Sequence, residues 1–321
     1  MFENTNFPKA KKYWFMGELY DWSRPVLHPM THALHYGTSV FEGIRAYNTP
    51  KGPAVFRLEK HVKRFFHSAS ILNMEVPYSR EEVTEAIKLV MRENELDSAY
   101  IRPLLFYSYG NLGLIPKDSP VELVIAAWEW GAYLGEKAQK GVHAYIIPWN
   151  RVHPSQIDMS AKLGGVYVQS TICGNIAREN DCDEAIFLNM EGNIAEGPGE
   201  NIMVVKEGVL KTNDKTESVL EGITRTSLLE IARDLGINTS IGPIKKQELL
   251  EADEVFFCGT AVELTPIIKI TNGSDPDSPK KEYIIGSGKR GEISDKIDKI
   301  FRDTLTGKTD KYEHWLDYVY D

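Results

Sequence analysis

Short apolar segments recur along the chain, and their spacing predicts strands and helices in mixed order. Residues 12–16 and 18–22 are aromatic-rich and flank Gly17, which is typical of two paired strands. The run at 121–127 is almost entirely apolar, as expected for a strand that is buried on both faces. Further strands are predicted at 99–107, 143–149, 184–189, 202–205 and 254–258.

Helices are predicted where apolar residues recur every three to four positions. One such segment spans residues 58–72, and Ser79–Glu82 has the pattern of a capping box that starts another helix. The buried face of this second helix is expected to carry Val83, Ile87, Val90 and Met91. A third helix is expected to begin near Gly222 and to stop at Gly236. The last predicted features are a helix at 291–305 and a docking tail at 313–317.

The strand at 99–107 carries polar residues of its own. Alternation along a strand places Tyr100 and Arg102 on one face, where they would suit a carboxylate ligand or a surface ion pair. Pro103 cannot donate a hydrogen bond to a neighbouring strand, so the strand is expected at an edge or distorted there. The mixture of strands and helices indicates an α+β or α/β fold.

Composition and charge exclude several classes of protein. The chain has 321 residues, with 42% hydrophobic and 26% charged, which is ordinary for a soluble globular protein. Its formal net charge of -9 argues against binding to nucleic acid or to an anionic membrane surface. No apolar run is long enough to span a bilayer, and residues 1–7 do not resemble a signal peptide. Three cysteines without metal-site spacing indicate free thiols in a reducing cytoplasm and no metal site.

The length allows two domains, and a boundary is predicted where the composition changes. Residues 128–137 contain two glycines and are followed by polar residues, which is typical of a linker. The predicted division is a small N-terminal domain at 1–132, an interdomain loop at 133–141 and a larger domain at 142–321.

Lys162 is the first candidate for chemistry. It lies in the segment Ser160–Gly165, among small residues and directly before two glycines. A closely packed lysine loses hydration, which favours the neutral amine that attacks an aldehyde to form a Schiff base. The glycines would let the backbone approach a cofactor ring closely. The alternative is a surface lysine in a turn before a helix.

Other parts of a pyridoxal phosphate site follow in the second half of the chain. Glu196 precedes a Gly-Pro-Gly bend and would pair with a protonated pyridine nitrogen, unless it only accepts backbone hydrogen bonds in a turn. The helix start at Gly222–Thr224 offers free N–H groups to a phosphate, and residues 259–261 form a second donor-rich turn.

Taken together, these segments resemble the branched-chain amino acid aminotransferases of fold type IV, a class IV aminotransferase group that depends on pyridoxal phosphate. The resemblance extends from about Trp14 to Trp315. The segments that carry it are HYGTSVFEGIRAY (35–47), AYIRPL (99–104), WGAYLG (130–135), SAKLGG (160–165), EGPGEN (196–201), EGITR (221–225) and ADEVFFCGTA (252–261).

The resemblance implies a small N-terminal α+β domain, a larger C-terminal pseudo-barrel domain and a cofactor between them. Lys162 is then the catalytic Schiff-base lysine, Glu196 the partner of the ring nitrogen and Tyr167 a donor to the ring's phenolic oxygen. The implied phosphate site consists of Arg64, Gly222, Ile223, Thr224 and Thr260. Taken alone, Arg64 would be a solvated charge on a helix.

The resemblance also implies the substrate site. Tyr100, with the amides of Thr260 and Ala261, matches the site for the α-carboxylate. Tyr36 and Arg102 match the clamp for the distal carboxylate of glutamate. The apolar side-chain pocket is formed by Phe41, Trp130, Tyr133 and Tyr167.

The implied activity is transamination of leucine, isoleucine and valine with 2-oxoglutarate through a pyridoxal phosphate aldimine, as in branched-chain amino acid biosynthesis. The implied assembly is a homodimer or a higher homo-oligomer in which a loop near Tyr109–Leu114 closes the partner's site. Two activities of the same fold compete, a D-amino acid aminotransferase and an aminodeoxychorismate lyase. A non-catalytic protein that binds phosphate ligands is the alternative from another class. The order of preference among the three amino acids stays open.

Overall fold

The chain folds into two compact units. The computed structural model describes residues 10–24, 27–130 and 137–320. The first unit consists of Met1–Gly131, Ala161–Gly165 and Asp303–Asp321, and the second of Ala132–Ser160 and Val166–Arg302. The sequence-based division assigned everything from residue 142 onwards to the large domain. In the structure, the lysine segment and the C-terminal residues pack with the first unit instead.

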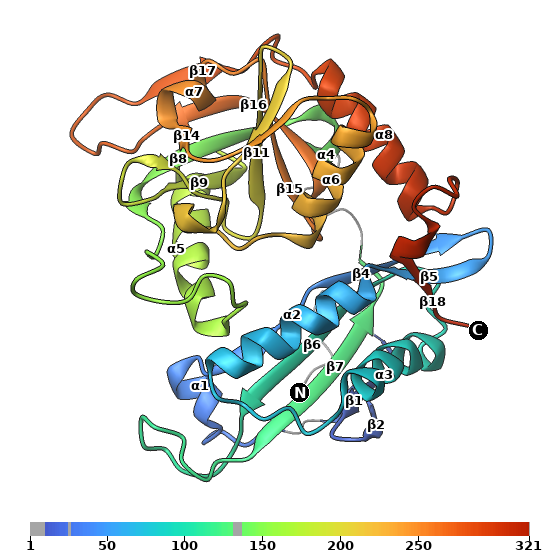
Figure 1. Ribbon diagram of the computed structural model, residues 1–321. Helices are drawn as coiled ribbons and strands as arrows, with labels where there is room; N and C mark the ends of the chain where they lie inside the picture. The colour runs from blue at the N-terminus through green and yellow to red at the C-terminus, as the bar shows by residue number, and fades with distance from the viewer. Residues whose placement is uncertain (1–9, 25–26, 131–136, 321) are drawn as a thin grey trace. The chain divides into compact units, whose positions relative to one another are not determined.

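The first unit is built on one sheet of eight strands, which two helices cover on one face. Its strand order is β18-β5-β4-β6-β7-β1-β2, and β3 also pairs with β6. Helices α2 and α3 lie side by side on this sheet (Figure 1). The strands are β1 (Lys12–Phe15), β2 (Glu18–Asp21), β3 (Ser39–Phe41), β4 (Ile44–Thr49), β5 (Gly52–Phe56), β6 (Ala99–Tyr107), β7 (Val121–Trp128) and β18 (Leu316–Tyr318). The helices are α1 (His32–Tyr36), α2 (Leu58–Ile71) and α3 (Arg80–Glu93).

Two local predictions for this unit are confirmed. Strands β1 and β2 pair antiparallel about Gly17, whose φ of 92° lies in the region that favours glycine. Helix α3 begins with a capping box in which the Ser79 side chain and the Glu82 backbone and side chain bond reciprocally. Both features depend on neighbouring residues, so a sequence pattern is enough to predict them.

Of the two expectations for the strand at Pro103, an edge position or a distortion, the edge position is wrong. Strand β6 is internal, because β7 pairs along its whole length on one side. On its other side, β3 pairs with residues up to Leu104 and β4 pairs from Ile101. Pro103 therefore faces the gap between two partner strands, where its missing N–H leaves no hydrogen bond broken. The residues that fill this gap are Glu42 and Gly43, and the Glu42 N–H donates to the Pro103 carbonyl at 3.0 Å.

The second unit contains a sheet of ten strands in the order β13-β12-β11-β15-β16-β8-β9-β10-β14, with β17 paired to β16. Its strands are β8 (Val142–Asn150), β9 (Glu184–Leu188), β10 (Asn193–Ile194), β11 (Asn201–Lys206), β12 (Val209–Thr212), β13 (Thr239–Ile241), β14 (Ile244–Lys245), β15 (Glu254–Gly259), β16 (Glu263–Asn272) and β17 (Lys281–Ile284). Its helices are α4 (Lys137–Lys140), α5 (Tyr167–Glu179), α6 (Ile223–Asp234), α7 (Lys246–Leu250) and α8 (Glu292–Leu305), of which α8 continues into the first unit.

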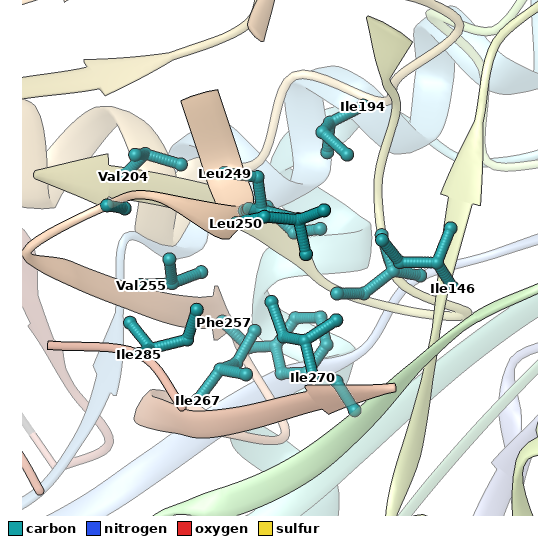
Figure 2. Packing of buried hydrophobic residues seen from close by; sticks show 14 of the residues in the cluster. Ile146, Ile194, Val204, Leu249, Leu250, Val255, Phe257, Ile267, Ile270 and Ile285 are labelled. Atoms are coloured by element: carbon teal, nitrogen blue, oxygen red, sulfur yellow. The ribbon is translucent and has the colours of Figure 1, made fainter. Parts of the chain in front are cut away.

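The central strands of this sheet are buried on both faces. Along β8, Ala144 and Ile146 join one apolar core, while Tyr145 and Ile147 join a second core with Cys173 and other residues of α5. Figure 2 shows the first core, in which side chains from the strands converge with Leu249 and Leu250 of α7. This two-sided burial explains why β9 is buried throughout and why the four residues after Glu184 are all apolar instead of alternating.

The C-terminal tail, which the sequence predicts only as a docking segment, adds a strand to the first sheet. Strand β18 pairs antiparallel with β5, and the Trp315 ring is buried beside the Arg57 guanidinium, 3.8 Å from its carbon. No helix among the described residues is both long enough and apolar enough to cross a membrane.

Candidate functional site

Lys162 packs against strand β3 in the first unit. Its carbonyl accepts a hydrogen bond from the Phe41 N–H at 3.2 Å, and its own N–H donates to Ser68 Oγ at 2.9 Å. Its Nζ lies 4.9 Å from the centroid of the Phe41 ring. The backbone and the amine are therefore both held beside Phe41, and Lys162 is not a lysine in an exposed surface turn.

The glycines after Lys162 allow close packing against the chain itself. A Cβ atom at Gly164 would lie 2.2 Å from Ser39 Oγ, and the Cα of Gly165 lies 2.9 Å from the Cβ position at Gly37. These glycines therefore permit a close approach to the segment around β3, and the expected approach to a cofactor ring stays a prediction. A larger residue at Gly164 would overlap the Ser39 side chain, so one of the two segments would have to shift.

Four predicted substrate residues of the first unit form one cluster with Lys162. The Arg102 guanidinium carbon lies 4.7 Å from the Phe41 ring centroid, and Arg102 Nη2 donates to the Tyr100 hydroxyl at 3.1 Å. The Tyr100 ring packs edge-on against Trp130 with centroids 4.4 Å apart. Arg102 Nε is buried and has no hydrogen-bond partner in the described chain. The cluster thus combines an aromatic surface, an amine and an arginine with an unused donor.

Gly43 determines how Tyr100 sits in this cluster. A Cβ atom at residue 43 would lie 2.1 Å from the Tyr100 hydroxyl oxygen, far inside the contact distance of two such atoms. Only glycine leaves room for the hydroxyl there, which accounts for the glycine of the FEG sequence at 41–43.

Of two further predicted substrate residues, Tyr36 and Tyr133, Tyr36 is not part of this cluster. Tyr36 is on α1, where its hydroxyl donates to the Leu112 carbonyl at 3.1 Å and its ring packs on His32. The described chain does not bring it into contact with Arg102. Tyr133 lies outside the described residues. The predicted clamp of Tyr36 with Arg102 is therefore not formed by hydrogen bonds within one chain.

Arg64 is held by a buried carboxylate that sequence reasoning missed. Glu42 is completely buried and accepts two hydrogen bonds from Arg64, Nε to Oε1 at 2.7 Å and Nη2 to Oε2 at 2.9 Å. Its Oε2 also contacts His61 Nδ1 at 2.8 Å. Arg64 is thus oriented by a fork, not free on a helix surface.

The charges in this group follow from its burial. Burial alone would raise the pKa of Glu42, but the Arg64 guanidinium and the His61 N–H hold that pKa well below its usual range. Burial lowers the pKa of His61, so the imidazole is neutral at pH 7. Because the ionised Glu42 carboxylate can only accept hydrogen bonds, His61 carries its proton on Nδ1 and donates it to Glu42.

In the second unit, Glu196 is a buried carboxylate with a donor at each oxygen. Arg151 Nε donates to Oε1 at 2.9 Å, and the Leu220 N–H donates to Oε2 at 3.0 Å. Sequence reasoning did not single out Arg151. Its signal in the sequence is a cation directly after an apolar strand, which is also common at a protein surface.

The predicted phosphate residues of this unit lie next to Glu196 in the fold. Leu220 leads into Gly222, the N-cap of α6, and a Cβ atom at Gly222 would lie 2.1 Å from Asn201 Oδ1. Asn201 begins β11 and pairs with Cys258, one residue before the end of β15. The turn with Thr260 and Ala261 follows directly. The first N–H groups of α6 and this turn therefore belong to the same end of the sheet.

The described residues contain neither an exposed thiol nor a group of side chains that could hold a metal ion. Cys173, Cys182 and Cys258 are free and buried, as predicted, and burial raises the pKa of each thiol. Within residues 10–24, 27–130 and 137–320, no three His, Cys, Asp or Glu side chains come together in a way that could hold a metal ion.

Comparison with known proteins places these features in a family context. Residues 39–270 match the model of the family described as amino-transferase class IV. A branched-chain-amino-acid aminotransferase of Pseudomonas aeruginosa is 43% identical over 95% of this chain and 96% of its own. A crystal structure of the Escherichia coli branched-chain amino acid aminotransferase superimposes with a TM-score of 0.91 at 42% identity, over 97% of this chain and 100% of the other. A crystal structure of the branched-chain amino acid aminotransferase from Thermobaculum terrenum in its PLP-form superimposes with a TM-score of 0.88 at 29% identity, over 98% of this chain and 100% of the other. These structures confirm the predicted fold.

The Glu42 group yields a prediction about stability and pH. We expect Glu42→Gln to lower the free energy of unfolding at pH 7 by ~3–5 kcal/mol, because it breaks a buried ion pair. Because folding lowers the pKa of Glu42, the unfolded state of the unmutated protein binds a proton at this carboxyl at a higher pH than the folded state does. The stabilisation by ionised Glu42 is therefore complete well above the usual carboxyl pKa of about 4.3, and it is lost as the pH falls below that value. The free energy of unfolding, measured with urea from pH 7 to pH 3, should therefore become similar for the unmutated protein and Glu42→Gln below about pH 4.5.

The matched control is Glu95→Gln, because Glu95 pairs with Lys11 at an exposed site and should matter little. Parallel curves for the native protein and Glu42→Gln across the whole pH range would contradict the charge assignment.

Proposed function

The chain belongs to the class IV aminotransferase family, and we propose that it transfers the amino group of branched-chain L-amino acids to 2-oxoglutarate, giving branched-chain 2-oxo acids and L-glutamate with pyridoxal phosphate as cofactor. The observation that carries this proposal is the cluster of Lys162, Phe41, Tyr100, Arg102 and Trp130 in the first unit. It places an amine beside an aromatic surface that carries an arginine. An apolar substrate needs the aromatic surface, and glutamate needs the arginine.

The residues of the second unit fit pyridoxal phosphate. Gly222 lets Asn201 approach the start of α6 closely, and the free N–H groups at this helix start suit a phosphate dianion. Glu196 is buried, as a partner of a cationic ring nitrogen should be. In the proposed arrangement, Ile223, Thr224 and Thr260 hold the phosphate with Arg64, and Tyr167 at the start of α5 donates to the phenolic oxygen.

The chemistry is divided between the cofactor and the chain. When bound, pyridoxal phosphate supplies an aldehyde for the amino group and a ring that accepts the electron pair released at the α-carbon. Lys162 Nζ would hold the aldehyde carbon of the bound cofactor until the amino group of the substrate displaces it. The freed amine would then take the proton from the substrate α-carbon and deliver it to the former aldehyde carbon of the cofactor. Phe41 supports this role, since its N–H fixes the lysine backbone and its ring lies beside Nζ.

Substrate recognition follows from the same groups. We propose that Tyr100 binds the α-carboxylate with the amides of Thr260 and Ala261. Phe41, Trp130, Tyr133 and Tyr167 line the side-chain pocket in this proposal. A buried distal carboxylate of glutamate needs a donor, and the unused Nε–H of Arg102 is available for it. Leucine makes no use of that donor.

The competing activities of the same fold are not favoured. The relatives at 42–43% identity are named branched-chain-amino-acid aminotransferases, and the match covers almost the whole length of both chains. The aromatic surface of Phe41 and Trp130 also suits an apolar side chain better than the polar substrate of a lyase.

We further propose a homodimer that forms through an exposed apolar patch around α1. The patch consists of Met30, Leu34, Tyr36, Tyr109, Leu114 and Ile115, of which Leu114 and Ile115 are 75% and 78% exposed. Its two segments are joined, since Thr31 bridges Tyr109 and the Tyr36 hydroxyl donates to the Leu112 carbonyl. Such a patch on a folded surface marks an interface. Tyr36 would then face the partner, where it could serve the partner's Arg102 clamp. Free buried cysteines support a cytoplasmic location.

The activity itself is tested by initial rates on the three branched-chain L-amino acids and on the substrates of the two competing activities. We expect the purified protein, loaded with pyridoxal phosphate, to use L-leucine, L-isoleucine and L-valine with 2-oxoglutarate, and to use D-alanine and aminodeoxychorismate poorly. A higher rate on D-alanine or aminodeoxychorismate would favour a competing activity. A colourless protein that binds no cofactor would favour a non-catalytic phosphate binder.

Arg102→Met is expected to separate the two half-reactions. Losing a charged hydrogen bond of ~1.5–3 kcal/mol should raise the KM for glutamate and 2-oxoglutarate by roughly 10- to 100-fold. The half-reaction with L-leucine, followed by the cofactor absorbance in a single turnover, should change little and is the internal control. Equal damage to both halves would show that Arg102 serves the α-carboxylate or the fold.

The dimer is tested by a charge within the patch. Ile115→Asp should reduce the mass in light scattering from twice 36.3 kDa toward 36.3 kDa at micromolar concentration. Ile284→Asp is the matched control, because Ile284 is 61% exposed on β17 of the second unit. A monomeric native protein, or an Ile115→Asp protein that keeps the native mass, would rule out this interface.

A further inference from the structure

Arg151 is a buried cation that the proposed reaction does not yet use. It follows strand β8, is 3% exposed, and its N–H donates to the Leu188 carbonyl at 2.7 Å. Its side chain is held on several sides. Nη1 lies 3.3 Å from both Gln169 Oε1 and Ser170 Oγ, and the guanidinium carbon lies 4.9 Å from the Phe187 ring centroid. Its Nε–H is directed at Glu196.

The opposite side of Glu196 is equally fixed. The Leu220 N–H that bonds Oε2 belongs to a loop whose buried Glu217 accepts hydrogen bonds from Asn189 and Asn193 at 2.8 and 3.0 Å. Asn213 donates to the carbonyl of Ala195, the residue before Glu196, at 2.6 Å. The carboxylate therefore cannot turn away from Arg151 without disturbing several buried bonds.

This geometry determines where a shared proton would reside. A carboxylate that faces a protonated ring nitrogen can take the proton back, which leaves two neutral groups, and burial favours that neutral pair. Protonation of Glu196 would, however, leave the buried Arg151 without its anionic partner, which is strongly unfavourable. A fixed guanidinium on Oε1 thus favours the ionised carboxylate and the protonated ring.

We infer that Arg151 is a positioning residue that keeps Glu196 ionised and thereby keeps the proton on the ring nitrogen of pyridoxal phosphate. The inference rests on the proposed function, in which Glu196 pairs with that nitrogen. Arg151 acts through Glu196 and gives the ring its capacity to accept electrons. Helix α5 has two roles in this arrangement. Tyr167 is the proposed donor to the phenolic oxygen of the cofactor, and Gln169 and Ser170 contact the Arg151 guanidinium.

The test is the ¹⁵N NMR signal of ring-labelled pyridoxal phosphate in the holoenzyme, recorded for the native protein, Arg151→Met, Arg151→Lys and Glu196→Gln. We expect the native protein to show a protonated ring nitrogen and Glu196→Gln an unprotonated one. Arg151→Met should move toward Glu196→Gln, while Arg151→Lys, which keeps the charge, should stay closer to the native signal. The single-turnover rate of Arg151→Met with L-leucine should fall by about tenfold, or ~1.4 kcal/mol.

Two controls separate this role from a general loss of stability. Arg290→Met breaks another ion pair of the second unit, with Asp298 at 2.8 Å, and should leave the ring signal native. If Arg151→Met holds too little cofactor to measure, the double variant Arg151→Met with Glu196→Gln removes both charges together. Its signal should equal that of Glu196→Gln alone, because Arg151 acts only through that carboxylate.

The outcomes distinguish the inference from the proposed function. A native ring signal in Arg151→Met, or a double variant that differs from Glu196→Gln, would overturn the role of Arg151. A native signal in Glu196→Gln would overturn the pairing of Glu196 with the ring nitrogen. A native protein that binds no cofactor would overturn the proposed function itself.

Discussion

Three consecutive residues, Phe41, Glu42 and Gly43, hold the candidate site of the first unit together. Phe41 is the last residue of β3 and pairs with Leu104, while Glu42 and Gly43 occupy the gap before β4, opposite Pro103 of β6. In this gap Glu42 and Gly43 are released from regular strand pairing. Each of them contacts a different predicted site residue, so the interruption of the sheet is what the local geometry depends on.

The contacts of these three residues differ in kind. Phe41 fixes Lys162 through a backbone hydrogen bond and places its ring beside Nζ. Glu42 orients Arg64 with a buried fork, and its burial makes the pair sensitive to the loss of either partner. Gly43 contributes by lacking a side chain, which gives the Tyr100 hydroxyl its place. A shift of this segment would therefore displace an amine, a cation and a hydroxyl together.

The second unit uses the same principle with different residues. A buried carboxylate is again pinned by an arginine, here Glu196 by Arg151, and glycine again permits a close approach, here Gly222 to Asn201. In both units the ionised groups are buried in pairs, so that each has a fixed orientation before any substrate arrives. Preorganised charge of this kind reduces the reorganisation that a reaction would otherwise require.

Local features were predictable from the sequence, and long-range partners were not. The hairpin at Gly17 and the capping box at Ser79 each depend on a few neighbouring residues. Glu42 and Arg151 were missed because their partners lie 22 and 45 residues away, and nothing in a single sequence pairs them. The expectation of an edge position for Pro103 failed for a related reason. An internal strand can accommodate this proline because β3 and β4 stop on either side of it. The clamp of Tyr36 and Arg102 came from family resemblance, and the fold of one chain does not bring the two into contact.

The most direct test of the central claim is chemical capture of the cofactor at Lys162. Borohydride reduction of the protein loaded with pyridoxal phosphate, followed by proteolysis and mass spectrometry, locates the lysine that binds the aldehyde. The account predicts a phosphopyridoxyl group on the peptide that contains Lys162, and its disappearance in Lys162→Ala. A label on another lysine of the native protein, or no label at all, would contradict the account.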